Sequence, residues 1–165
     1  MDHHRISKKA YLRKYIIFNF IFIYQPMDYD TLEISIHPNS NIKSIKFLLN
    51  GKLHNSRGPA KLIYSESEEL LKEYYYINGK KSRLYAPAVI TYFAGAKPLA
   101  KKLEYFYKGY RHNKYGPAII RLDKYGNKKY ETYYNMGLLH NTEGPACHNY
   151  IHNKKRWIIN GIEQH

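Results

Sequence analysis

Cysteine is almost absent from this chain, which has one, Cys147, among 165 residues. A single cysteine excludes an internal disulfide framework of the kind that holds small secreted folds together. The sequence also lacks zinc-ligand spacings, a phosphate-binding glycine loop and the Gly-x-Ser-x-Gly motif around a nucleophilic serine. We therefore expect no enzymatic activity, no metal, no cofactor and no small-molecule substrate.

Acidic residues are scarce. There are 13 Asp and Glu against 27 Lys and Arg, which gives a formal net charge of +14. The excess has two interpretations: an anionic partner, such as nucleic acid or an acidic membrane surface, or lysines on solvated faces that keep the protein soluble. Because the lysines are scattered along the chain, the second is favoured. The candidate contacts for an anionic partner are Lys80, Lys81, Lys101 and Lys102.

No apolar run is long enough to span a bilayer. The longest run, residues 15–24, is interrupted by Asn19 and follows a basic segment. Three interpretations of residues 1–26 are open: a signal peptide, an uncleaved anchor or disordered arm, and an extension upstream of a natural start at Met27. The third is ranked first, and a signal peptide last, because no small-residue cleavage site follows the run.

What the sequence has in abundance is one ten-residue motif, which occurs four times. The copies begin at Gly51, Gly79, Gly109 and Gly137, and a fifth start at Gly161 reaches the end of the chain. Copies one, three and four read Gly-x-x-His-Asn-x-x-Gly-Pro-Ala, whereas copy two has Ser82 and Ala86 at the His and second Gly positions. Constant length inside the motif, with variable spacers outside it, indicates a tandem structural repeat.

The residue types of the motif predict a turn followed by a strand. Glycine allows a positive φ, Asn-Gly is a strong turn signal, and proline fits the first residue of a strand. An aromatic residue stands four positions before each glycine, and an apolar run follows each Pro-Ala pair. The motif residues expected to be structural are Gly51, His54, Gly58, Pro59, Gly79, Pro87, Gly109, His112, Gly116, Pro117, Gly137, His140, Gly144 and Pro145.

The motif resembles the MORN repeat group, in the variant known from uncharacterised proteins of large DNA viruses. The resemblance rests on three copies that carry Gly, His, Gly, Pro and Ala in register, and it covers about residues 44–165. It implies an all-β protein linked to protein assembly or to acidic membrane surfaces. It also favours an intracellular location, in the infected host cytoplasm or the virion, over secretion.

Together these observations predict an all-β fold in which tandem antiparallel hairpins form an elongated twisted sheet or open solenoid. Residues 27–50 would be an N-terminal capping hairpin, since Leu32, Ile34 and Ile36 alternate with polar residues. Residues 51–165 would hold four MORN-like hairpin repeats with a truncated C-terminal end. Variable turns at 65–72 and 94–102 would confer the identity of a partner.

Three recurrent histidines, His54, His112 and His140, suggest a metal site, but geometry argues against it. Equivalent positions two strands apart are separated by roughly 9–10 Å, whereas shared zinc ligands must each lie about 2.1 Å from one ion. We expect each imidazole to bind loop backbone groups next to its own glycine. The aromatic residues before each glycine are interpreted as a packed core row in preference to a base-stacking platform.

The function expected from the sequence is a non-catalytic protein-interaction or scaffold module. The first alternative is peripheral binding to anionic phospholipid through lysine-rich loops. Nucleic-acid binding is ranked below it.

Overall fold

The computed structural model describes residues 28–95 and 97–164, and the regular structure in this part of the chain is entirely β-strand. The predicted all-β fold of antiparallel hairpins is therefore confirmed. The predicted arm at residues 1–26 lies outside the described residues.

Ten strands pair in chain order across the main sheet, and every pairing is antiparallel. They are β1 (Thr31–Ile36), β2 (Ile42–Leu49), β4 (Lys61–Tyr64), β5 (Leu70–Tyr74), β8 (Val89–Tyr92), β9 (Ala100–Glu104), β12 (Ile119–Leu122), β13 (Lys128–Thr132), β16 (Cys147–Asn149) and β17 (Lys154–Arg156). An eleventh strand, β3 (Lys52–Leu53), pairs with β2 off this path.

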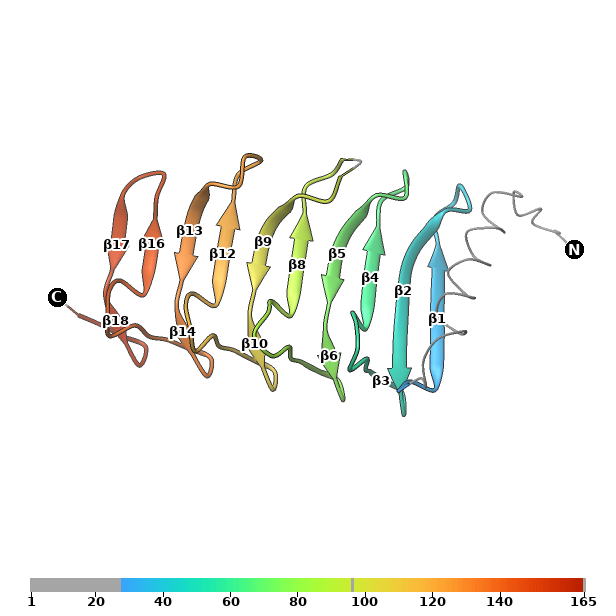
Figure 1. Cartoon of the computed structure of the whole chain (residues 1–165), viewed down its shortest axis with the longest axis horizontal. Coiled ribbons are helices and arrows are strands. Elements are labelled where there is room, and N and C mark those ends of the chain that lie inside the picture. Colours follow the sequence, from blue (N-terminus) through green and yellow to red (C-terminus); the bar gives the residue numbers. More distant parts are fainter. Residues whose placement is uncertain (1–27, 96, 165) are drawn as a thin grey trace, which may run out of the picture.

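Short two-stranded hairpins follow the longer strands. They pair β6 (Tyr76–Ile77) with β7 (Lys80–Lys81), β10 (Phe106–Tyr107) with β11 (Tyr110–Arg111), β14 (Tyr134–Asn135) with β15 (Leu138–Leu139) and β18 (Ile158–Ile159) with β19 (Ile162–Glu163). Figure 1 shows the long strands side by side in one elongated layer, with these hairpins along one edge. The turns that join the long strands lie along the opposite edge. Each motif copy therefore lies on the hairpin edge of the sheet.

Motif alanines anchor each copy to the main sheet. Ala60, Ala88, Ala118 and Ala146 are all completely buried. Each of their carbonyls accepts a hydrogen bond from the backbone N–H of the aromatic residue that precedes a motif glycine. The donors are Phe47, Tyr75, Tyr105 and Tyr133, at 2.7–2.9 Å. We call this series the aromatic–alanine row. Alanine suits it because the side chain must fit beside large rings: Ala88, for example, packs with Val89, Phe106 and Tyr75.

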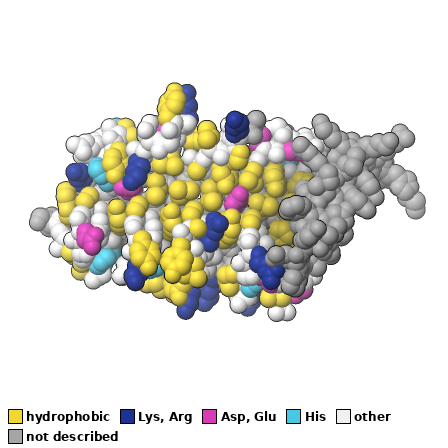
Figure 2. Space-filling view, in the orientation of Figure 1, with side chains coloured by type: hydrophobic (Ala, Val, Ile, Leu, Met, Phe, Trp, Pro, Cys, Tyr) yellow, Lys and Arg dark blue, Asp and Glu magenta, His cyan; other side chains and the backbone are white. Residues whose placement is uncertain are grey.

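One face of the main sheet is largely apolar. Directly paired residues of neighbouring antiparallel strands lie on the same face, which places Ile45 with Leu62, and Ile90 with Leu103 and Ile120. Figure 2 shows hydrophobic side chains spread across the middle of one face with few charges among them. The best-packed part is at the N-terminal end, where Ile42, Ile45 and Phe47 are buried.

The aromatic residues predicted to form a packed core row are buried to different extents. Phe47 is 6 % exposed and meets the ring of Tyr29 edge-on at 4.8 Å. Tyr75, Tyr105 and Tyr133 are half-buried, and Trp157 is 47 % exposed. Trp157 follows β17, the last strand of the sheet, so no further alanine-bearing strand lies beside it.

The aromatic–alanine row generates a test. Ala88→Leu should lower the free energy of unfolding by about 1–3 kcal/mol, because the added atoms have no space beside Phe106 and Tyr75. Urea unfolding followed by tyrosine fluorescence would measure the loss. The control is Ala94→Leu, an exposed position in a turn at the opposite edge, which should change stability by less than about 0.5 kcal/mol. Equal losses would show that tight packing at Ala88 is not a constraint.

Candidate interaction surfaces

The opening glycine of each copy forms a hairpin turn, as predicted. Gly51, Gly79, Gly109, Gly137 and Gly161 have φ between 70° and 94°, and the residue before each has φ of 45–50°. Two successive positive φ angles are typical of the type I′ turns that match the twist of a hairpin. Asparagine, which adopts a positive φ more readily than most residues, occupies this position in three copies, as Asn50, Asn78 and Asn160. The other two copies have Lys108 and Met136 there, residue types that adopt a positive φ less often.

The Gly-Pro segments are held by the asparagine that follows the motif histidine. In copies one, three and four, the Nδ2 atoms of Asn55, Asn113 and Asn141 donate to the carbonyls of Pro59, Pro117 and Pro145, at 3.0–3.2 Å. Copy two replaces this asparagine with Arg83, whose guanidinium donates to the Pro87 carbonyl at 3.3 Å. The loop conformation is therefore kept although the residue type changes.

The second motif glycines, Gly58, Gly116 and Gly144, do not have a positive φ. A Cβ added there would meet the neighbouring asparagine amide nitrogen at 3.4–3.7 Å, which is close to ordinary contact. This explains why copy two accommodates Ala86.

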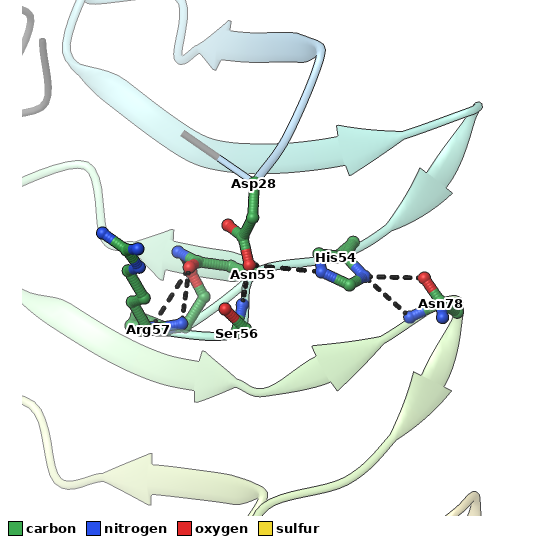
Figure 3. Close-up of polar contacts among 8 residues, drawn as sticks. Asp28, His54, Asn55, Ser56, Arg57 and Asn78 are labelled. Atoms are coloured by element: carbon green, nitrogen blue, oxygen red, sulfur yellow. Dashed lines mark hydrogen bonds and ion pairs between the residues drawn. The ribbon is translucent and has the colours of Figure 1, made fainter. Parts of the chain in front are cut away.

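The motif histidines bind the backbone, but not next to their own glycine as predicted. Nδ1 of His54 accepts from the backbone N–H of Asn78 at 3.0 Å, in the turn of the next copy (Figure 3). In the same way, Nδ1 of His112 accepts from the backbone N–H of Met136 at 3.4 Å, and Nδ1 of His140 accepts from that of Asn160 at 3.2 Å. In copy two the Ser82 hydroxyl takes this place and accepts from Lys108 N–H at 3.4 Å. This hydrogen bond, repeated in all four copies, therefore joins each copy to the turn of the next one. It can form because adjacent short hairpins lie side by side.

His54 has a second partner at the N-terminal end of the described chain. Its Nε2 lies 3.2 Å from an oxygen of Asp28, and the same oxygen accepts from Ser56 N–H at 2.6 Å (Figure 3). Burial of Asp28 opposes its charged form, but the hydrogen bonds from Ser56 and the nearby His54 outweigh it and hold the pKa below its ordinary value. Asp28 thus caps the first motif loop.

The three motif histidines do not form a metal site. Each is committed to the turn of a different copy, and the described residues contain no group of three His, Cys, Asp or Glu side chains that could hold a metal ion.

The remaining reactive side chains also have structural partners. Cys147 pairs with Thr132 and Arg156, whereas His148 faces the other side of the sheet, so the two do not form a nucleophile–base pair. Burial raises the pKa of the Cys147 thiol, which lowers its reactivity at neutral pH.

Two carboxylates on the apolar face accept hydrogen bonds from tyrosines. The Tyr75 hydroxyl donates to Glu73 at 2.9 Å and the Tyr150 hydroxyl donates to Glu131 at 2.6 Å. Burial, followed by the hydrogen bond to Glu73, raises the pKa of Tyr75 to about 12. For Tyr150 the hydrogen bond to Glu131 is the main reason that its pKa rises to about 12. Both tyrosines therefore remain protonated donors across the physiological pH range.

The lysines proposed from the sequence as anionic-partner contacts are not brought together. Lys80 and Lys81 form β7 on the hairpin edge, whereas Lys101 and Lys102 lie in β9 of the main sheet. Lys102 is ion-paired with Glu104, and the Lys81 ammonium lies 5.0 Å from the centre of the Phe106 ring. These four residues do not form one cluster.

A groove with exposed aromatic walls lies between the loops of copies two and three. Tyr85 and Tyr115 occupy equivalent positions in these loops and are 81 % and 72 % exposed, with ring centres 6.1 Å apart and planes inclined by 34°. Leu84, beside them, is 70 % exposed. We call this the tyrosine groove. Its volume is about 280 Å³, and Tyr105, Phe106 and Tyr107 are among the residues that line it.

The tyrosine groove has a strained wall and a positive charge. Tyr85 has a φ of 59°, which is rare for a bulky residue that is not Gly, Asn or Asp. The charged residues of its lining are Arg83, Lys114 and the titratable His112, with no carboxylate. The next groove along, between copies three and four, has both Glu143 and Lys114 in its lining. The aromatic pair and the uniform charge therefore distinguish one groove from its neighbour.

Sequence reasoning missed Tyr85 and Tyr115. The available signal was the departure of copy two from the motif, together with tyrosine at the residue before Ala86 and Gly116. Tyrosine is so common in the chain, with 19 residues, that these two did not stand out.

Comparison with protein-family models, curated proteins and solved structures finds no match. The similarity to MORN repeats therefore rests on the motif residues alone. Within residues 28–95 and 97–164 there is no helix that could cross a membrane.

The histidine contacts predict a graded loss of stability. His54→Ala should lower the free energy of unfolding by about 1–3 kcal/mol, because it leaves the Asn78 N–H without its acceptor at a buried site and removes one of the two partners of the Asp28 carboxylate. His140→Ala should cost less than about 1 kcal/mol, since its single bond is exposed to water. Urea denaturation of both variants measures the difference, and a larger loss for His140→Ala would contradict the account.

The Asp28 contacts predict a dependence on pH. A carboxyl whose pKa is lowered by folding stabilises the native state above its unfolded pKa, and the effect disappears as pH falls through the folded value. Asp28→Asn should therefore be less stable than the parent at neutral pH, and the two should converge as pH falls through the lowered pKa of folded Asp28. Thermal unfolding followed by circular dichroism across this range would test it. A difference that persists unchanged at low pH would show that the charge of Asp28 is not what matters.

Proposed function

We propose that the chain is a non-catalytic protein-interaction module that binds an extended segment of a partner in the tyrosine groove. The observation that carries the proposal is the pair Tyr85 and Tyr115, whose ring centres lie 6.1 Å apart on adjacent loops and whose side chains are largely exposed. Tyrosines of this kind supply large contact area at a small entropic cost when a partner covers them, and they are frequent among residues that dominate binding energy.

The surroundings of the pair support the same proposal. More than half of the exposed large hydrophobic side chains belong to the short hairpins and motif loops of this edge. They are Ile77, Leu84, Tyr85, Tyr107, Tyr110, Tyr115, Met136, Leu138, Trp157, Ile159 and Ile162. Exposed apolar surface collected along one edge is typical of a site that a partner covers.

The strain at Tyr85 points in the same direction. A positive φ at a bulky residue costs on the order of 1–3 kcal/mol, and strained residues of this kind cluster at active sites, ligand clamps and switch regions. Copy two is also the copy that departs from the motif, at Ser82, Arg83 and Ala86. Its loop keeps the motif contacts by other means and presents Leu84 and Tyr85 to solvent.

The chemistry of the groove indicates the partner segment. An aromatic, aliphatic or proline side chain would pack in the groove against the exposed surfaces of the two tyrosine rings. Asp or Glu residues flanking it would face Arg83 and Lys114. We therefore propose an acidic segment with an apolar anchor.

Binding to anionic phospholipid through lysine-rich loops is less well supported, because Lys80–Lys81 and Lys101–Lys102 lie on separate parts of the fold.

Selection from a library of displayed peptides tests the proposal. The library is selected against the parent protein, and the selected peptides are then measured against Tyr85→Ser/Tyr115→Ser. We expect the peptides to contain an apolar anchor beside Asp or Glu, and the double variant to weaken their binding by roughly 30-fold or more, as for residues that dominate an interface.

The matched control is Tyr125→Ser, which removes an equally exposed tyrosine (77 %) from a turn on the opposite edge of the sheet. It should leave affinity unchanged. Peptides that bind the double variant as tightly as the parent, or that depend on Tyr125 to the same degree, would refute the groove as the binding site.

A further inference from the structure

The face of the main sheet opposite the apolar one gathers cations that are distant in the sequence. The register pairs Lys46 with Lys61, Lys72 with Thr91, Thr91 with Lys102, Lys102 with Arg121, and Asn149 with Lys154. Directly paired residues share a face, as do residues two apart in one strand. We call this surface the basic face; its cations are Lys46, Lys61, Lys72, Lys102, Arg121, Lys154 and Arg156.

The carboxylates near this face neutralise only part of its charge. Glu33 binds Lys46 at 2.8 Å, Glu104 is ion-paired with Lys102, and Glu163 binds Arg156 at 2.8 Å. Lys61, Lys72, Arg121 and Lys154 have no ion-pair partner among the described residues. Four free cations therefore lie on one sheet face, and none of them was singled out from the sequence, because they belong to four different strands.

Aromatic rings lie among these cations. Tyr74 is paired with Lys61, whose ammonium lies 5.7 Å from the centre of the ring. Tyr130 is paired with Arg121, whose guanidinium lies 5.7 Å from its ring. Tyr130 is also paired with Asn149, a further hydrogen-bonding side chain on the same face. Cations alternating with aromatic rings and polar groups provide both of the contacts that single-stranded nucleic acid offers, phosphates and base faces.

We infer that the basic face binds single-stranded nucleic acid, with the strand running across the β-strands from β4 towards β17. Lys72, Arg121 and Lys154 belong to β5, β12 and β17, each three strands from the next, which is roughly 14 Å at 4.8 Å per strand. Such a line of charge follows an extended phosphate backbone. An open sheet also leaves unpaired bases accessible to tyrosine rings, whereas the bases of a duplex are already stacked.

This inference is independent of the tyrosine groove, which lies on the hairpin edge and uses other residues. The two proposals can therefore fail separately.

The test is binding of fluorescein-labelled oligo(dT) and oligo(rU) of about twelve nucleotides, within the range of known single-strand sites, measured by anisotropy between about 0.05 and 0.2 M salt. Each phosphate neutralised contributes roughly −0.7 to the slope of log Kobs against log salt, so four free cations predict a slope of about −3. Lys72→Gln/Arg121→Gln should halve the slope. Lys97→Gln/Lys124→Gln, which removes the same charge from exposed turns, should leave it unchanged.

Two further variants complete the test. Tyr130→Leu should weaken oligonucleotide binding by several-fold without changing the slope, since it removes stacking but no charge. Tyr85→Ser/Tyr115→Ser should have no effect. Circular dichroism confirms that each variant remains folded.

Three results would overturn the inference: no oligonucleotide binding by the parent protein, an equal loss of slope in both glutamine pairs, or unchanged affinity of Tyr130→Leu. It would equally be refuted if a duplex of the same length, or vesicles of phosphatidylcholine and phosphatidylserine in equal parts, bound at least as tightly as the single strands at the same salt. Preference for oligo(rU) or for oligo(dT) identifies which nucleic acid is bound, and either preference supports the inference.

Discussion

The structure depends on contacts between neighbouring motif copies, because residues 28–95 and 97–164 form one layer of β-sheet and supply no second layer to cover it. Main-chain hydrogen bonds from the aromatic residues to Ala60, Ala88, Ala118 and Ala146 join each copy to the preceding strand. The motif His or Ser side chain then joins each loop to the next turn. Stability of this kind is local and additive along the chain, and the end strands are its weakest points. The last strand, β17, carries Lys154, Lys155 and Arg156, and charged edges of this kind deter pairing with another sheet.

The need for contacts between neighbouring copies fixes some motif positions and leaves others available for binding. The buried alanine and the turn glycine of each copy are needed for the packing of one copy on the next. Their residue types therefore cannot change to create a binding site. Between the motif histidine and proline, only the two residues before the second glycine position vary among copies one, three and four. Tyr85 and Tyr115 lie there, in two adjacent copies. The flat faces of the sheet provide a second variable surface, where charge can accumulate without disturbing the hairpin edge.

Much of the fold follows from the sequence, since its requirements are local. Asn-Gly predicts the hairpin turns correctly, and the alternation of Leu32, Ile34 and Ile36 predicts β1. The interruption at Tyr75 that separates β5 from β6 was not predicted, because the aromatic run there looks like one continuous strand. The partner of each motif histidine was predicted wrongly, because the sequence does not show that a loop lies closer to the next turn than to its own. The basic face was missed for a related reason: Lys72 and Arg121 appear scattered until the register, with its bulges, places them together.

We propose that copy two departs from the motif because its loop binds a partner, and not because folding requires the change. Replacing residues 82–88 with the sequence of residues 140–146 would test this directly, because the exchange restores the His, Asn and Gly of the motif and removes Leu84 and Tyr85. We expect an unfolding midpoint in urea equal to or above that of the parent, together with loss of affinity for peptides selected on the tyrosine groove. A large fall in the midpoint, or full retention of peptide binding, would contradict it.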